Sequence, residues 1–596
     1  MALGVLNGTG ESPPGTVVLY EQEENLNTAF SAFKHGSGKD SNIVLSPQPS
    51  NSPNDPLNWP LHKKNLTYFI VFVNSILLAS IPAPSIAPAT FLLAGKLGRS
   101  LEDIAKLSGY QLLLCGCFGL VLVLHTPKSD IQLDSLTGIE TDFSNIHRPI
   151  VSALAHKYGK RPQFLLASLM GVIGTVICIA SGEDYNVLLA GRIVQGFGST
   201  AYESLSIAVI GDLFFVHQRS LRTGLTILTL TCLVSLVAII GGPITEHLGW
   251  RYLFIIYLPF SIVGAVAAFL FLPETQFRRE VGREDVVPKE SIHVPKGTRD
   301  RVTGVEEGSS PEKMKHAHVE SGGEMKLGEG STSTAVSTTE EKKTFVHELA
   351  LFSGVYTETG LFKLFLAPFA TLLNLSVVWS ILVGGFCIAF YVSLSYILAQ
   401  IFSVPPYNLN AAQNGYFYVG ALIGGLLSGV LGSMLGDLIT TKLTKWNNGI
   451  YEPEFRIPVL ILSALLYAIG WFVFKWRLDN PTPHGYYLAA FCHGCLCAAV
   501  TIGSTATSLY ILDSYRTSAT EVFIVSMTIK NLLFYGFSNF MNDWAADDGP
   551  SQVLKTYGIV TMCIMGTSLP IYVLGKVIRR FIMRVGVMEK LAKAYV

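Results

Sequence analysis

An arginine and a glutamate lie inside one of the long apolar stretches of this chain, where a lipid-facing or core helix would carry neither. Residues 191–210 read GRIVQGFGSTAYESLSIAVI and contain Arg192 and Glu203. A charge at the centre of a bilayer costs about 2.5–3.5 kcal/mol on insertion scales, so each group needs a polar cavity or a partner. A carboxylate in such a place can take up a proton or hold a cation, and an arginine can tune it. We therefore single out both residues for proton coupling or substrate binding.

Helical geometry places these two residues on one face. They are 11 residues apart, which at 100° per residue is about 20° beyond three full turns. Ser199 falls on the same stripe, and Gly196 and Gly198 thin the helix so that a neighbour or a substrate can approach closely. A structural tie between neighbouring helices is the alternative interpretation.

Other ionisable residues lie near a second apolar stretch. Lys530 falls near the middle of a predicted span at 520–541 and also needs a partner. Asp513, Arg516 and Glu521 surround the start of that span. They indicate a solvated or salt-bridged turn, with a gating contact as the alternative.

Composition assigns the chain to the membrane class. Of 596 residues, 49% are hydrophobic and only 14% are charged, too few charges to cover a soluble protein of this size. The formal net charge of zero gives no case for a nucleic-acid partner. The run CHGCLC at 492–497 matches no closed zinc pattern and lies in a predicted span, so we interpret it as helix packing. We expect no metal and no cofactor.

Twelve apolar stretches approach the ~20 residues that a transmembrane helix needs. They predict an all-α integral membrane fold with spans near 66–90, 107–124, 163–181, 186–210, 223–243, 252–272, 374–400, 413–435, 457–475, 486–512, 520–541 and 556–577. Residues 1–63 and 273–362 are polar and low in apolar residues, so we expect a disordered tail and a disordered linker. Lys and Arg collect before the first span, after spans 2, 4 and 8, and after the last. This pattern places both termini, including the tail 581–596, in the cytosol.

The second predicted span is too short. From Gly109 to Leu124 it offers 16 residues before a polar stretch that contains several acidic residues. Removing residues 124–151 joins GYQLLLCGCFGLVLV to SALAHKYGKRP and restores a span of ordinary length with a basic exit. We hypothesise that 124–151 is a retained intron, with a genuine insertion as the alternative.

Two short segments suggest that the chain contains a repeat. SALAHKYGKR follows span 2 and SMLGDLITTK follows span 8, which pairs His156 with Asp437. Together with two sets of six spans, this pattern favours two bundles around a midplane site, as in secondary transporters.

These motifs resemble the major facilitator superfamily, specifically its fungal twelve-span drug:proton antiporter branch. LLAGRIVQGFG resembles the fourth-helix motif R-x-x-Q-G, with Arg192, Gln195 and Gly196 on the matched positions. HKYGKRP resembles the loop motif after the second helix through Lys157, Gly159, Lys160 and Arg161, with His156 in place of the aspartate. AIIGGPITEHLGW, which contains Gly241, Gly242 and Pro243, resembles the fifth-helix antiporter motif. NDPLNWPLHKKN and NNGIYEPEFRIP are similar to fungal signatures of this branch.

The resemblance implies alternating access between two six-helix bundles, 64–272 and 363–580. Proton coupling or substrate binding is assigned to Arg192, Glu203, Gln195 and Lys530. Cytosolic gating is assigned to His156, Lys157, Gly159, Lys160, Arg161, Asp437, Asp513, Arg516 and Glu521. Helix bending and close packing are assigned to Gly241, Gly242 and Pro243.

The expected function is proton-coupled efflux of a small organic molecule, such as a secondary metabolite or drug, by a monomer in the plasma membrane. AYESL and KNLLFYGFSNFMNDWA are closer to the subgroup with yeast polyamine and cation carriers, so uptake of polyamines or other organic cations is the alternative. A transport-inactive sensor is a further alternative. No ATP-binding P-loop and no grouped nucleophile and base are visible in the sequence, so we expect neither a primary pump nor an enzyme.

Overall fold

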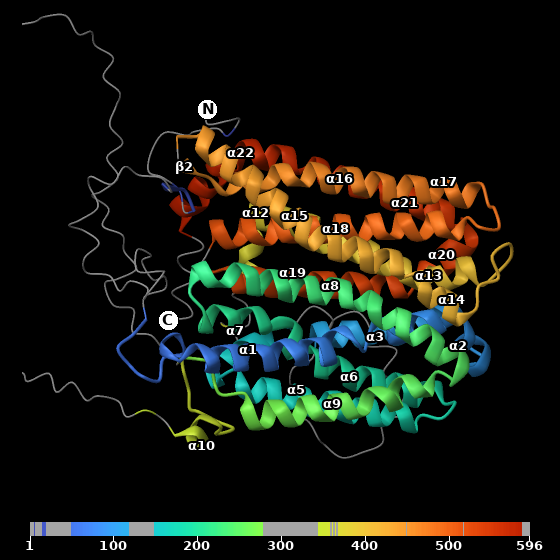
Figure 1. Ribbon diagram of the computed structural model, residues 1–596, viewed down its shortest axis with the longest axis horizontal. Helices are drawn as coiled ribbons and strands as arrows, with labels where there is room; N and C mark the ends of the chain where they lie inside the picture. The colour runs from blue at the N-terminus through green and yellow to red at the C-terminus, as the bar shows by residue number, and fades with distance from the viewer. Residues whose placement is uncertain are drawn as a thin grey trace, which may run out of the picture.

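Long helices that run side by side make up the computed structural model of this chain (Figure 1). It describes residues 49–117, 148–277, 344–357, 368–448, 450–515 and 518–586, together with residues 5, 13, 15–18, 342, 360 and 364. The start of the first long helix and the end of the last lie at the same end of the helices, here called the terminal end (Figure 1). The opposite end is called the distal end.

The first half of the chain begins with a helix that is broken near its middle. This segment comprises α1 (Leu61–Asn74), the π-helical turn η4 (Ser75–Ser80), the 3-10 turn η5 (Pro84–Ala89) and α2 (Thr90–Leu97). Pro82, Pro84 and Pro88 cause the break, because proline lacks the N–H of a helical hydrogen bond. The half continues with α3 (Leu101–Cys117), α4 (Arg148–Tyr158), α5 (Arg161–Ala180), α6 (Tyr185–Ser204), α7 (Ser206–Leu213), α8 (Val216–His247) and α9 (Arg251–Phe271).

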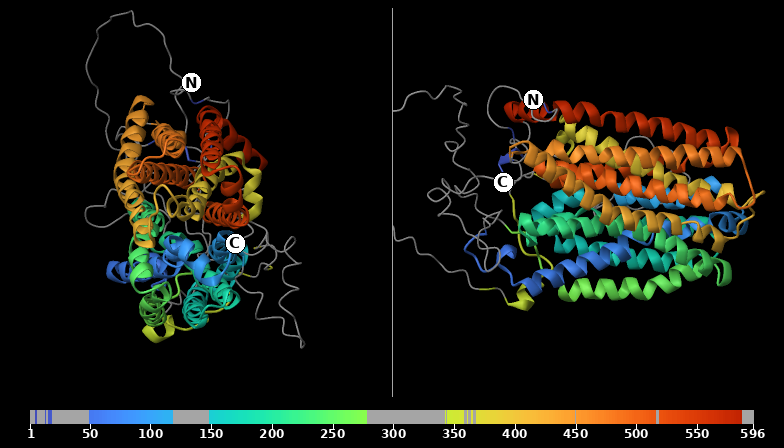
Figure 2. Two further views of the ribbon diagram at one scale, coloured as in Figure 1. Left: turned by 90° about the vertical axis from the view of Figure 1, so that its right-hand side faces the viewer. Right: turned by 45° about the horizontal axis from the view of Figure 1, so that its top comes forward.

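The second half repeats this arrangement of long antiparallel helices. Its elements are η8 (Thr371–Leu373), α12 (Leu375–Ile381), η9 (Leu382–Phe386), α13 (Cys387–Phe402), α14 (Ala411–Tyr416), α15 (Val419–Trp446), η10 (Pro453–Val459), α16 (Leu460–Ala468), η11 (Ile469–Val473), α17 (Phe474–Asp479), α18 (Tyr486–Ser514), α19 (Ala519–Ser538), α20 (Met541–Asp547), α21 (Pro550–Gly566) and α22 (Ser568–Val585). The short helix α10 (Phe345–Glu348) precedes it. Seen along the helices, the two halves form two adjacent groups (Figure 2).

Nine helical segments of the described chain are long and apolar enough to cross a membrane by length and composition. Three further parts complete the two groups: α3, α6 with α7, and α19. Arg192 and Glu203 lie in α6, and Lys530 lies in α19. Two of these three parts therefore carry the charges that the sequence singles out.

The two halves pack closely at the distal end. The distal part of α8 lies against α14, and α3 lies against α19. Tyr110 of α3 contacts Tyr535 of α19, with ring centroids 5.1 Å apart. The backbone N–H of Ala411 at the start of α14 donates to Glu246 of α8 at 3.1 Å. These contacts join the halves on the distal side of the space between them.

The structure differs from the predicted disordered tail at several places. Val17–Val18 (β1) pairs antiparallel with Ile450–Tyr451 (β2), at the terminal end of the second half. A short 3-10 helix, η3 (Pro56–Asn58), precedes α1, which begins before residue 64. The backbone pairing and the Pro-led turn supply order that composition alone does not reveal.

The predicted second span begins earlier than expected. α3 starts at Leu101 rather than near 107, because the Ser100 hydroxyl accepts from the Asp103 N–H at 3.1 Å and the acids Glu102 and Asp103 suit the first turn of a helix. Residues 124–147 of the hypothesised insertion lie outside the described residues, and 148–151 belong to α4. α3 and α4 both pack against α19. This shared neighbour is what two pieces of one interrupted span would have.

A chain without residues 124–151 should be more stable than the full chain. Closing a loop of about 30 residues costs roughly 3 kcal/mol of chain entropy, and a continuous helix would avoid most of that cost. We expect a higher melting temperature in detergent, measured by size-exclusion chromatography after heating. A cDNA that retains these codons across residues 108–165 would contradict the retained-intron hypothesis, and equal melting temperatures would contradict the stability prediction.

Candidate functional site

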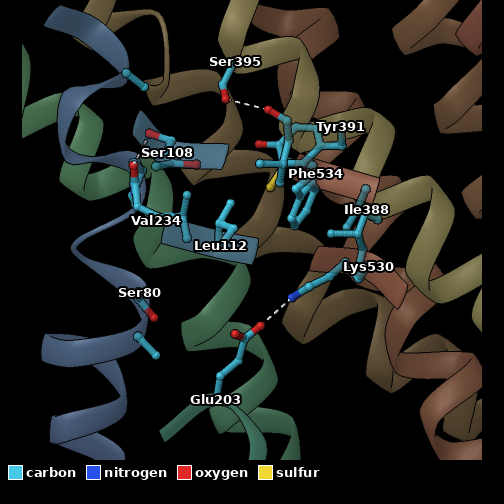
Figure 3. Close-up of a pocket in the computed structure, with 18 of the residues that line it drawn as sticks. Ser80, Ser108, Leu112, Glu203, Val234, Ile388, Tyr391, Ser395, Lys530 and Phe534 are labelled. Carbon is cyan, nitrogen blue, oxygen red and sulfur yellow. Dashed lines mark hydrogen bonds and ion pairs between the residues drawn. The ribbon is translucent and has the colours of Figure 1, made fainter. Parts of the chain in front are cut away.

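A central cavity lies between the two halves of the described chain. Its volume is about 190 Å³, many times the space that one water molecule needs. Side chains from η4, η5, α3, α6, α8, α13, α18 and α19 line it, so both halves contribute walls (Figure 3). Among the described residues that line the cavity, two carry a formal charge, namely Glu203 and Lys530.

These two charges form an ion pair across the cavity. Lys530 Nζ of α19 lies 2.7 Å from Glu203 Oε1 of α6, and Figure 3 shows the two side chains pointing toward each other. Asn531 Nδ2 donates to the other carboxylate oxygen at 3.3 Å. The two charged side chains are 13% and 11% exposed. Because the partners come from different halves, the pair links the halves directly.

The remaining cavity wall is apolar, aromatic or hydroxylated. The tyrosines and phenylalanines among its described residues all come from the second half: Tyr391, Tyr396, Tyr418, Phe523 and Phe534. Serines of both halves add hydroxyl groups, among them Ser80, Ser108, Ser395 and Ser504. Such a surface can hold a largely apolar molecule and orient it through a few polar contacts.

Arg192 occupies a different place from Glu203. Its side chain is fully buried in the first half and donates to the carbonyl oxygens of Pro82 at 2.7 Å and Ala83 at 3.3 Å. A third bond, at 3.1 Å, goes to Gln195 Oε1. The guanidinium therefore satisfies carbonyl groups at the proline-broken part of the first helix, which forms one wall of the cavity.

The other members of the predicted stripe also fix neighbouring helices. Gln195 donates to Thr175 of α5 at 2.9 Å, and Ser199 donates to the carbonyl of Leu78 at 2.6 Å. Thus α6 uses Arg192, Gln195 and Ser199 to hold elements of its own half, whereas Glu203 reaches the other half.

The α4–α5 loop packs on the chain that follows α9. Gly159 has a φ of +98°, and a Cβ there would lie 2.2 Å from Glu274 Oε2, so glycine fits both the backbone and the space. Glu274 accepts from the backbone N–H groups of Lys160 and Arg161, each at 3.0 Å. Burial raises the pKa of the Glu274 carboxyl, and hydrogen bonds from backbone N–H groups oppose that rise.

The basic side chains of this loop have separate partners. Lys160 forms an ion pair with Asp212 of α7, and Arg161 donates to the carbonyls of Ala350 at 2.9 Å and Phe269 at 2.8 Å. The Lys157 carbonyl accepts from the Tyr356 N–H at 2.9 Å. His156 is partly buried one turn before Lys160. The loop therefore joins α7, α9 and the segment around residue 350 at the terminal end.

The predicted gating residues of the second half divide into two groups. Arg456 forms ion pairs with Asp437 of α15 (Nη1 to Oδ1, 2.8 Å) and with Asp513 of α18 (Nε to Oδ2, 3.2 Å). Glu521, in the first turn of α19, is 6% exposed and its Oε2 atom has no hydrogen-bond partner. Arg516 lies outside the described residues. Asp437 and Asp513 thus belong to one cluster organised by an arginine that sequence reasoning did not single out.

Gly241 and Gly242 lie where α8 meets other helices. A Cβ at Gly242 would be 2.7 Å from the Ala411 carbonyl oxygen and 2.9 Å from Gly415 Cα, both of α14. A Cβ at Gly241 would approach the Ser85 carbonyl at 3.2 Å. Pro243 follows inside the same helix. Gly242 therefore permits the close distal contact between the halves, and Gly241 permits a close contact within the first half.

The sequence does not reveal a buried charge cluster at the terminal end of the second half. Arg579 of α22 contacts Glu454 through two bonds, at 3.0 and 2.7 Å, and Glu452 at 3.0 Å. All three side chains are fully buried. Lys576 pairs with Glu452, and Thr16 of the tail donates to the same carboxylate at 2.7 Å. The segment YEPEFRIP, read only as a signature, supplies both acids.

His493 also has a place that its sequence context does not reveal. It lines the cavity from α18, among aromatic rings. Residues 493, 497, 500, 504 and 508 all line the cavity, and their spacing of three or four residues places them on one face of α18. This spacing is the sequence signal that could have identified His493. Among the described residues, no group of three or more His, Cys, Asp or Glu could hold a metal ion.

Two halves of long helices around a shared cavity agree with the comparison to known families. The sequence pattern of the Major Facilitator Superfamily matches residues 143–534. The chain belongs to this superfamily. It is thus an integral membrane transporter with the major facilitator fold, and its family consists of transporters rather than enzymes.

Fungal transporters are among the relatives of this major facilitator protein. An uncharacterised MFS-type transporter of Schizosaccharomyces pombe is 23% identical over 96% of this chain and 94% of its own length. An MFS-type efflux transporter of Aspergillus flavipes is 28% identical over 28% of this chain and 30% of its own length. The solved structure of the human organic anion transporter MFSD10 (TETRAN) matches with a TM-score of 0.48 and 14% identity, over 86% of this chain and 100% of that chain.

Gly242→Val should open the transporter on its distal side. The added side chain would overlap the α14 backbone, and overpacking of this kind costs about 1–3 kcal/mol. We expect a cysteine introduced at Ser395 in the cavity to react faster with a maleimide added from the distal side. The rate of labelling at that position can be followed by mass spectrometry.

Gly224→Val is the matched control, because it lies in the same helix and a Cβ there has no neighbour within 4 Å. We expect its labelling rate to equal that of the parent protein. Equal rates for both valine variants would show that the α8–α14 contact does not close the distal side.

Proposed function

We propose that this transporter is a proton-coupled member of the drug:proton antiporter branch that exports a small organic molecule, such as a secondary metabolite or drug. The observation that carries the proposal is the Glu203–Lys530 ion pair, which links the two halves inside the cavity. Efflux transporters among the fungal relatives support the direction, among them the Aspergillus flavipes protein, which matches over 30% of its own length.

The ion pair offers a direct way to couple protons to motion between the halves. A proton on Glu203 removes its negative charge, leaves Lys530 without its counter-ion and weakens the link at 2.7 Å. Loss of that proton re-forms the link. Because the carboxylate lines the cavity, protonation and cargo binding can act on the same group.

Other predicted residues have supporting roles in this proposal. Arg192 and Gln195 hold the broken first helix, which forms one cavity wall, and so they position the site. The α4–α5 loop, with the Lys160–Asp212 pair, stabilises one state at the cytosolic face. Gly241, Gly242 and Pro243 allow the distal contact to form and separate. The termini are proposed to be cytosolic, the protein monomeric and its location the plasma membrane.

The pairing of Glu203 favours efflux of an uncharged or weakly charged molecule over polyamine uptake. A polyamine would have to displace the Lys530 ammonium group, which already neutralises the carboxylate. A membrane sensor without cargo would have no use for a cavity of this size with an ion pair inside it.

The test uses yeast that lack their own polyamine carriers and express either the full chain or the chain without residues 124–151. Accumulation of Nile red, a neutral planar dye, and of labelled spermidine is measured at acidic outside pH. We expect less Nile red than in empty cells, a protonophore to abolish the difference, and unchanged spermidine. Extra spermidine uptake would favour the importer, and Nile red export that survives the protonophore would exclude proton coupling.

A further inference from the structure

His493 is a buried polar residue at the cavity wall with an unused hydrogen-bonding atom. It is 1% exposed, and its Nδ1 has no hydrogen-bond partner. Three aromatic rings surround the imidazole. The ring centroid of Tyr391 lies 5.2 Å from that of His493 in a stacked arrangement, that of Tyr418 lies 5.2 Å away edge-on, and that of Phe417 lies 5.4 Å away. Buried polar groups are nearly always hydrogen-bonded, so an unpaired nitrogen beside a cavity marks a place for a ligand group.

Two further polar groups of the same half share this property. The Tyr396 hydroxyl of α13 and the Ser504 hydroxyl of α18 line the cavity, are less than a tenth exposed, and have no hydrogen-bond partner. Ser504 follows His493 by 11 residues, so both lie on one face of α18, about 16 Å apart along the helix axis. We call His493, Tyr396 and Ser504 the polar wall. Its groups are all uncharged hydroxyls or an imidazole, each able to donate or accept one hydrogen bond.

The charges in the cavity favour an uncharged cargo. The described lining residues with a formal charge, Glu203 and Lys530, already neutralise each other. A charged ligand would have to break that pair, whereas a neutral ligand can bind while the pair remains available for protons. Apolar side chains such as Ile388 and Phe534 complete the wall and suit the carbon skeleton of such a molecule (Figure 3).

We propose that the polar wall binds the hydroxyl or carbonyl groups of a neutral, planar and mostly apolar organic molecule whose ring lies against the aromatic residues beside His493. The inference rests on the proposed function, because it assigns a class of cargo to the same cavity. His493 contributes the central hydrogen bond, and Tyr391 contributes a ring face.

The experiment compares two probes that differ by one hydroxyl group, 2-naphthol and naphthalene, bound to the full-length protein in nanodiscs. Equilibrium dialysis gives the ratio of their dissociation constants. We expect the protein to bind 2-naphthol about tenfold more tightly, the size of one good hydrogen bond. In His493→Phe, which keeps a ring and loses the hydrogen bond, the ratio should fall to about one. His493→Asn, whose amide can replace Nδ1, should retain it.

The matched control is His484→Phe, because His484 is exposed in the distal loop before α18. It should leave the ratio unchanged. If His493→Phe failed to fold, binding of both probes would fall together. The ratio measured for His493→Asn would then decide between the proposal and its rejection. A ratio near one in the unmodified protein, no binding of either probe, or an unchanged ratio in His493→Phe would overturn the proposal. If proton-driven export were absent while the unmodified protein still bound 2-naphthol about tenfold more tightly than naphthalene, the proposed function would be refuted and the assignment of the polar wall would stand.

Discussion

Glu203→Gln should strongly reduce proton-driven export while leaving the folded protein able to exchange cargo. Glutamine keeps an oxygen that can accept from Lys530, which lies 2.7 Å from Glu203 Oε1, but it cannot take up a proton. A coupling free energy of about 1–3 kcal/mol corresponds to a 5- to 150-fold effect, so gradient-driven flux should fall by about that factor. Two fluxes of Nile red are measured in proteoliposomes: transport driven by an imposed pH gradient, and exchange of the dye across the membrane without a gradient.

Two variants make this result specific. Glu183→Gln changes an exposed acid in the distal loop before α6 and should leave both fluxes unchanged. Lys530→Gln removes the ammonium group instead, and gradient-driven flux should fall there too, because the Glu203 carboxylate then remains in a largely apolar cavity without that positive charge beside it. If Glu203→Gln lost exchange and gradient-driven flux equally, the carboxylate would serve binding or folding rather than coupling.

The fold could be predicted because membrane insertion depends on a property that is local in sequence. Each apolar stretch satisfies its own backbone hydrogen bonds as a helix, so length and hydropathy identify it without knowledge of its neighbours. The expectation fails at boundaries set by specific contacts. α3 begins at Leu101 because Ser100 caps its first turn through the Asp103 N–H, and β1 forms because β2 offers an open edge. Neither partner is visible in hydropathy.

The candidate site could be predicted one residue at a time but not as a set of contacts. Glu203 and Lys530 each stand out as charges in apolar segments, yet their separation of 327 residues hides the pairing. The helical face that Arg192 and Glu203 share does not indicate that they belong to one site, because the 11 residues between them place them about 16 Å apart along α6. At these two depths the helix meets different neighbours: the broken first helix for Arg192 and α19 for Glu203.

Arg579→Met should destabilise the second half strongly. The substitution would leave the fully buried carboxylates of Glu454 and Glu452 without the guanidinium that they share at 2.7–3.0 Å. Removing one partner of a buried ion pair costs about 3–5 kcal/mol, because an uncompensated charge remains in apolar surroundings. We expect a much lower melting temperature in detergent and little protein in the membrane fraction, both measured against the unmodified chain.

The same reasoning predicts a partial rescue, which separates lost charge balance from lost packing. Glu454→Met combined with Arg579→Met removes one acid together with the base, and Lys576 still pairs with Glu452. The double variant should therefore be more stable than Arg579→Met alone. Arg584→Met, an exposed change in the same helix, should cost less than about 1 kcal/mol. If the double variant were as unstable as Arg579→Met alone, removal of the Glu454 charge would bring no gain. The stability of α22 would then depend on the packing of the arginine side chain rather than on its charge.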